Sequence, residues 1–146
     1  MKNLLYLLMT FILISCSTET KPIAYGTDAC DFCEMTIVSK AYSAQAVSEK
    51  GKQFKYDAIE CMVNDLHDHP AVMEIQQVAD FSNPGSMMKV EEALFIINDS
   101  INSPMGANLA AVGKASNIAS PQSADTFFWD DLITHLLEND SIFNKD

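Results

Sequence analysis

The densest group of chemically active side chains lies near the start of the chain, in the segment Cys30-Asp31-Phe32-Cys33-Glu34-Met35. Thiolate and thioether sulfur are soft donors, which favour Cu(I) over harder ions such as Mg²⁺, Ca²⁺ or Mn²⁺. The Thr-Ile-Val run that follows favours an extended segment over residues 35–42, in which residues i and i+2 point to one face. Cys33 and Met35 would then present sulfur side by side, with Cys30 one turn earlier. The segment therefore predicts a soft-metal site.

Three other chemistries fit the same cysteines. An exported thiol–disulfide oxidoreductase would use Cys30 and Cys33, although such a motif normally stands at a helix N-terminus, which lowers the thiol pKa. A structural zinc site would need two further ligands, for which Cys61 with His67 or His69 are the candidates. Cys61 and His67 stand about 240° apart on a regular helix, so these two cannot bind one metal. A plain Cys30–Cys33 disulfide with Met35 buried is the third alternative. The residues favour copper and leave these alternatives open.

The first residues of the chain read as an export signal. Lys2 precedes an apolar stretch over residues 4–14, interrupted only by Thr10, which has the length of a signal-peptide core and is too short to span a bilayer. The stretch ends in Leu-Ile-Ser-Cys16, which resembles a bacterial lipobox and implies cleavage before Cys16 with lipid attached to its thiol. We therefore expect a signal peptide over 1–15 and a lipidated N-terminus and tether over 16–27.

Charge excludes one large class of partner. The chain has no arginine, nine lysines and twenty acidic residues, for a formal net charge of -11. Phosphate binding needs clustered basic side chains, so nucleic acid is not expected as a partner. The apolar fraction of 48% is sufficient to bury a core.

The elements that must position the cysteines alternate between strands and helices. Lys50-Gly51 predicts a hairpin turn between strands, and the pair Asp57 and Glu60 is typical of a capping box at a helix start. Apolar residues at helical spacing follow, and a turn-forming cluster over 82–86 marks a boundary. The predicted strands are 35–42, 44–49, 52–56, 73–81, 93–98 and 107–112; residues 117–123 are predicted as loop, and the predicted helices start at 57 and span 125–138. This order predicts an α+β fold with mostly antiparallel sheet, in two lobes over 28–82 and 83–146.

Four segments in order resemble the NosL family of copper-binding lipoproteins. They are the lipobox-like end at Cys16, the segment from Cys30 to Met35, the helix start Tyr-Asp-Ala-Ile-Glu-Cys-Met over 56–62, and Ser-Pro-Met-Gly over 103–106. The resemblance implies two small ββαβ-like lobes and a monomeric Cu(I) carrier rather than an enzyme. It also implies copper held by Cys33, Met35 and Met105, with Cys30 as a further candidate ligand.

The same resemblance implies a place and a client. The protein would be anchored by its lipid on the periplasmic side, at the outer membrane. It would deliver copper for the copper centre of nitrous oxide reductase, with a copper-loading membrane transporter complex acting between the two proteins.

The remaining sulfur-containing residues are assigned differently. Met62 and Met73 are predicted to pack in the core, while Cys61 lies away from the centre of the apolar helix face. Residues 87 and 88, both methionine, have no assigned role.

Overall fold

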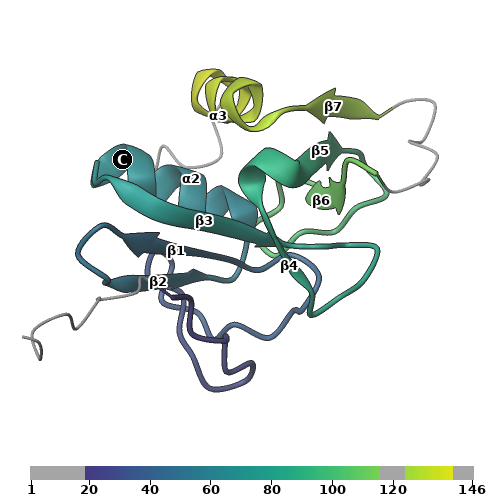
Figure 1. Ribbon diagram of the computed structural model, residues 1–146. Helices are drawn as coiled ribbons and strands as arrows, with labels where there is room; N and C mark the ends of the chain where they lie inside the picture. Colours follow the sequence, from purple (N-terminus) through teal and green to yellow (C-terminus); the bar gives the residue numbers. More distant parts are fainter. Residues whose placement is uncertain (1–18, 116–123, 140–146) are drawn as a thin grey trace, which may run out of the picture.

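The computed structural model describes residues 19–115 and 124–139 (Figure 1). The predicted signal peptide, the predicted lipid anchor Cys16 and the predicted loop over 117–123 lie outside these residues. In the part of the chain that is described, none of the helices has the length and apolarity needed to cross a membrane.

Four antiparallel strands form the first sheet, in the order β2-β1-β3-β4. They are β1 (Ala44–Ser48), β2 (Gln53–Tyr56), β3 (Met73–Ala79) and β4 (Met87–Lys89). The predicted hairpin is confirmed, because β1 and β2 pair across a turn whose Gly51 has a φ of +77°. β4 follows the turn over 82–86 and still pairs with β3. The division into lobes at 82 and 83 therefore stays a prediction.

The second sheet has three antiparallel strands in the order β6-β5-β7. They are β5 (Ala93–Ile97), β6 (Leu109–Gly113) and β7 (Asp125–Phe127), and the short 3-10 helix η1 (Val90–Glu92) leads into β5. The helix α2 (Ile59–Asp68) lies between the first sheet and α3 (Trp129–Glu138), as Figure 1 shows. The predicted α+β class is confirmed.

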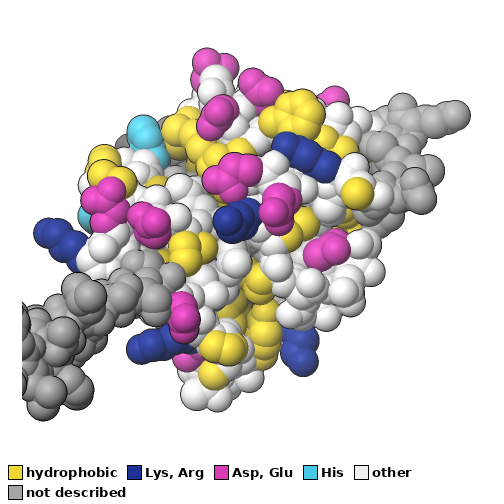
Figure 2. All heavy atoms as spheres, in the orientation of Figure 1, with side chains coloured by type: hydrophobic (Ala, Val, Ile, Leu, Met, Phe, Trp, Pro, Cys, Tyr) yellow, Lys and Arg dark blue, Asp and Glu magenta, His cyan; other side chains and the backbone are white. Residues whose placement is uncertain are grey.

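One continuous core joins both sheets and both helices. Its fully buried side chains include Tyr56, Met62, Phe95, Leu109 and Leu132. Met62 is therefore a core residue as predicted, and Met73 packs against the same cluster while remaining half-buried. Acidic side chains are scattered over the face shown in Figure 2, so the negative charge does not mark a single binding patch on that face.

Three local predictions were wrong. Residues 35–42 form no strand, because the chain turns at Glu34 and only Thr36 makes an isolated bridge, to Ala29. The predicted helix over 125–138 begins with three residues of strand, since β7 pairs with β5 before α3 starts at Trp129.

The third wrong prediction is the capping box at the start of α2. Ala58 is the N-cap of α2, without a side-chain hydrogen bond, because the two predicted cap residues have other partners. Asp57 accepts a hydrogen bond from the backbone N–H of Val38 at 3.3 Å, and Glu60 is bonded to Ser103.

Candidate metal centre

Three thiols meet where the cysteine-containing turn reaches the start of α2. The Sγ atoms of Cys30, Cys33 and Cys61 all lie within 4.8 Å of one another. Cys61 belongs to the first turn of α2, and the other two come from the segment that precedes β1. All three are free cysteines. Among the described residues, no other group of three or more His, Cys, Asp or Glu side chains is placed to hold a metal ion.

The backbone of the turn directs donors at the sulfur atoms. The N–H of Glu34 donates to the carbonyl of Cys30 at 3.0 Å, and the N–H of Cys30 donates to the carbonyl of Met35 at 2.8 Å. Glu34 has a φ of +61°, which reverses the chain. Backbone N–H groups of Cys33, Asp57 and Phe32 near the Cys30 sulfur lower the pKa of its thiol. Such donors stabilise a thiolate, so the turn is built to hold negative sulfur.

The three thiols divide the charge unequally. A hydrogen bond from the Cys61 thiol, helped by the backbone donors and opposed by burial, lowers the pKa of Cys30 to about 5. The same hydrogen bond, together with burial and the neighbouring negative charge, raises the pKa of Cys61. Burial raises the pKa of Cys33. The cluster therefore favours a thiolate on Cys30, while Cys33 and Cys61 keep their protons.

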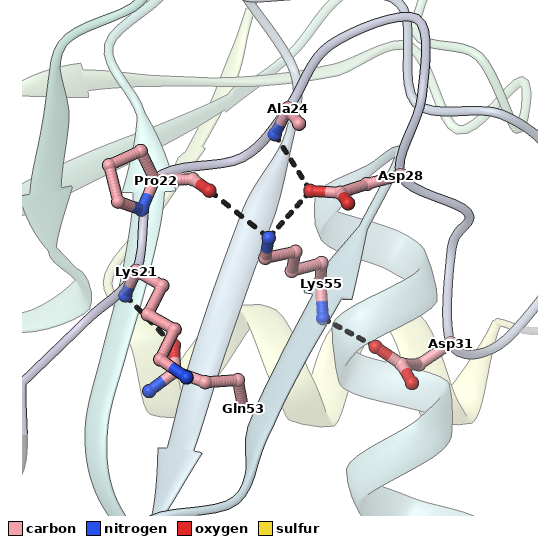
Figure 3. A network of polar contacts seen from close by, with 7 residues as sticks. All are labelled: Lys21, Pro22, Ala24, Asp28, Asp31, Gln53 and Lys55. Carbon is pink, nitrogen blue, oxygen red and sulfur yellow. Dashed lines mark hydrogen bonds and ion pairs between the residues drawn. The ribbon is translucent and has the colours of Figure 1, made fainter.

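The strand β2 holds the cysteine segment in place through Lys55 (Figure 3). The Lys55 ammonium lies 2.5 Å from the Asp28 carboxylate and also donates to the carbonyl of Pro22 at 3.1 Å. The backbone of Lys55 exchanges two bonds with Asp31, donating to its carboxylate at 2.6 Å and accepting from its N–H at 2.8 Å. The hydrogen bond from Lys55 lowers the pKa of Asp28. Residues 28 and 31 flank the first cysteine, so its position is fixed from both sides.

The three thiols differ in their exposure to solvent. Cys30 is 1% exposed and Cys61 is fully buried, whereas Cys33 is half-buried. Met35, two residues after Cys33 in the sequence, is 46% exposed. An ion or an incoming ligand would reach Cys33 first.

Not all predicted site residues are where the sequence indicated. Cys30 and Cys33 meet as expected, and Met105 lies in a tight turn but is half-buried against the core instead of exposed. Cys61, which the sequence left without a copper-binding role, is buried against the other two thiols. The sequence signal for Cys61 was the odd number of thiols that would remain if Cys16 were lipidated.

The fold and the site together define a small α+β protein with a buried three-thiol centre. The model of the NosL family matches residues 23–128, and the chain belongs to this family. Among solved structures, the chain is similar to the copper chaperone NosL from Shewanella denitrificans, with a TM-score of 0.65 and 16% identity. The match covers 79% of this chain and 96% of the Shewanella chain, which confirms the fold. A comparison with curated proteins finds no match.

Proposed function

We propose that the protein is a Cu(I) metallochaperone and that Cys30, Cys33 and Cys61 are its thiolate ligands. The observation that carries the proposal is the meeting of three free thiols within 4.8 Å of one another. Thiolates select Cu(I) among the metals available to an exported protein, and structural zinc sites have four ligands, whereas the described residues bring no fourth Cys or His to this cluster. Membership of the NosL family, and the similarity to the copper chaperone from Shewanella, support copper as the cargo.

The chemistry of such a carrier is ligand exchange, without turnover of a substrate. The Cys30 thiolate is available at neutral pH as the first ligand, because the pKa of its thiol is about 5. Cys33 and Cys61 lose their protons as the metal binds, as thiol ligands must. The half-buried Cys33 is the position at which an acceptor's thiolate or thioether attacks, and the exposed Met35 offers a transient donor beside it.

The setting of this chemistry follows from the family and from the export signal. The lipobox-like sequence ending at Cys16 supports a lipid anchor on the periplasmic side, at the outer membrane. The proposed client is nitrous oxide reductase, reached through its copper-loading membrane transporter complex. The carrier would act as a monomer, and its second lobe would contribute the thioether of Met105 to the bound copper.

An anaerobic titration tests the proposal. Reduced protein competes for Cu(I) with a chromophoric chelator such as bicinchoninate, and we expect one tight site. Cys33→Ser and Cys61→Ser should each weaken it by at least about 100-fold, because even residues beyond the ligands are worth 10–100-fold in metal sites. Met73→Leu is the matched control for Met105→Leu, since both thioethers are half-buried against the core. Wild-type affinity in Cys61→Ser would remove the three-thiol assignment.

A thiol–disulfide oxidoreductase using Cys30 and Cys33 is the second candidate, and the low pKa of Cys30 is the observation in its favour. Burial opposes it, because a thiolate that is 1% exposed cannot attack the disulfide of another protein. We expect no catalytic reduction of insulin by the metal-free, reduced protein. Turnover at a rate comparable to that of a known dithiol reductase would establish the second candidate and displace the first.

A further inference from the structure

The first turn of α2 carries a buried carboxyl group beside the ligand Cys61. Glu60 is fully buried, and burial raises its pKa. Its Oε1 accepts a hydrogen bond from the Ser103 hydroxyl at 2.5 Å, which opposes the effect of burial on the pKa. Its Oε2 has no hydrogen-bond partner among the described residues. Burying such a group is costly. Its hydrogen bond to Ser103 indicates which part of the fold the carboxyl group stabilises.

Ser103 begins a turn of the second lobe. The carbonyl of Ser103 accepts the N–H of Gly106 at 3.0 Å, which closes a β-turn around Pro104 and Met105. Gly106 has a φ of +84°, a conformation that a side chain would strain. The Ser103 hydroxyl also accepts the N–H of the first residue of β6 at 3.4 Å. Glu60 therefore holds this turn through Ser103, two residues before Met105.

The same helical turn thus faces two sulfur sources. Cys61 reaches the thiols of the first lobe, and its neighbour Glu60 grips the turn that presents Met105. Met105 packs against the core cluster that also contains Cys30 and Cys61. We infer that Glu60 is a positioning residue, which acts through Ser103 to place the thioether of Met105 as a donor to copper held by the thiols. The inference rests on the proposed function and adds the device that joins the two lobes around one ion.

A double-mutant cycle on the full-length, metal-free protein tests this inference. Cu(I) affinity is measured by chelator competition for Met105→Leu, Ser103→Ala and the combination. We expect each single change to weaken binding by about 10-fold, in the range typical of residues that orient ligands. The double variant should also lose about 10-fold, not about 100-fold, because both changes remove the same donor. Copper K-edge absorption should show one sulfur fewer in all three variants.

Two further variants separate positioning from general stability. Ser82→Ala removes a surface serine–carboxylate bond, 2.6 Å to Asp80, and should leave the affinity unchanged. Glu60→Gln keeps an oxygen that accepts from Ser103 and should bind copper like wild type, whereas Glu60→Leu should behave like Met105→Leu.

Independent losses in the double variant would overturn the inference, as would wild-type affinity in Ser103→Ala. Equal losses in Glu60→Gln and Glu60→Leu would also overturn it, because the hydrogen bond would then be irrelevant. If Cys33→Ser retains full affinity, the proposed function itself fails, a result separate from any of these.

Discussion

Replacing Glu34 by glycine should stabilise the metal-free protein. Glu34 directly follows Cys33 and has a φ of +61°, in the left-handed region that side chains disfavour. Its N–H bond to the Cys30 carbonyl, at 3.0 Å, depends on that conformation, so the turn imposes it on the residue. The turn of the cysteine segment therefore destabilises the folded state locally at Glu34. Glycine adopts the same backbone conformation without this strain.

The magnitude follows from two opposing contributions. A left-handed conformation costs a residue with a side chain roughly 1–2 kcal/mol. Glycine also has more conformational freedom in the unfolded chain, and this offsets about 0.4–1 kcal/mol of the stabilisation. Glu34→Gly should therefore raise the free energy of unfolding by about 0.5–1 kcal/mol. For a domain of this size, that corresponds to a rise in Tm of about 2–4 °C.

Urea and thermal unfolding of reduced, metal-free protein measure this change. Glu34→Gln removes the charge and keeps the side chain, and should leave stability nearly unchanged. Glu34→Asn should fall between Gln and Gly, because asparagine tolerates the left-handed region better than most residues. Glu74→Gly, at an exposed site in β3, should destabilise by about 0.5–1 kcal/mol. A Glu34→Gly protein no more stable than Glu34→Gln would refute the argument that the turn is strained.

Three further predictions concern hydrogen bonds and protons. Tyr56→Phe should lower the unfolding free energy by about 1.5–3 kcal/mol in urea, because the buried hydroxyl donates to the Asp65 carboxylate at 2.7 Å. Lys55→Met should cost about 0.5–1 kcal/mol at pH 7. Because Lys55 lowers the folded-state pKa of Asp28, its contribution is present above the unfolded-state pKa, and the difference from wild type should vanish as the pH falls through the folded-state value. Cu(I) affinity, measured by chelator competition, should rise about 100-fold per pH unit near neutrality, because two of the three thiols must lose a proton on binding. An affinity that does not change with pH would mean that the three thiols are already deprotonated before copper binds.

Local patterns predicted the elements whose signals are local. The hairpin around Gly51 was identified because turn chemistry acts over a few residues, and the strand β3 was identified although its side-chain alternation is broken at residues 76 and 77. The capping box at Glu60 failed because a tertiary hydrogen bond to Ser103 outcompeted the local one. The strand after Cys33 failed because Glu34 adopts a backbone conformation that its residue type disfavours.

The third thiol could not be found by the same route. A helical projection of α2 places Cys61 relative to its own apolar face, but it cannot show what packs on its other side. That neighbour is set by the pairing of Lys55 with Asp31, which brings the cysteine turn against the helix start. The odd thiol count was the available signal, and it required the assumption that Cys16 is lipidated. The sequence thus predicted two of the three cysteines in the cluster, and the third depends on contacts between distant segments.

Retention and release make opposite demands on a copper carrier, and the cluster separates them by depth. In the proposed carrier, the buried Cys30 and Cys61 would be out of reach of an acceptor, and their sulfur atoms would retain the ion. Cys33 is half-buried, and Met35 beyond it is exposed. Exchange must therefore begin at Cys33, because an acceptor's sulfur can bind there before the buried ligands dissociate. A site of three equally exposed thiols would give up copper to any thiol in solution, while three buried ones would not transfer it at all.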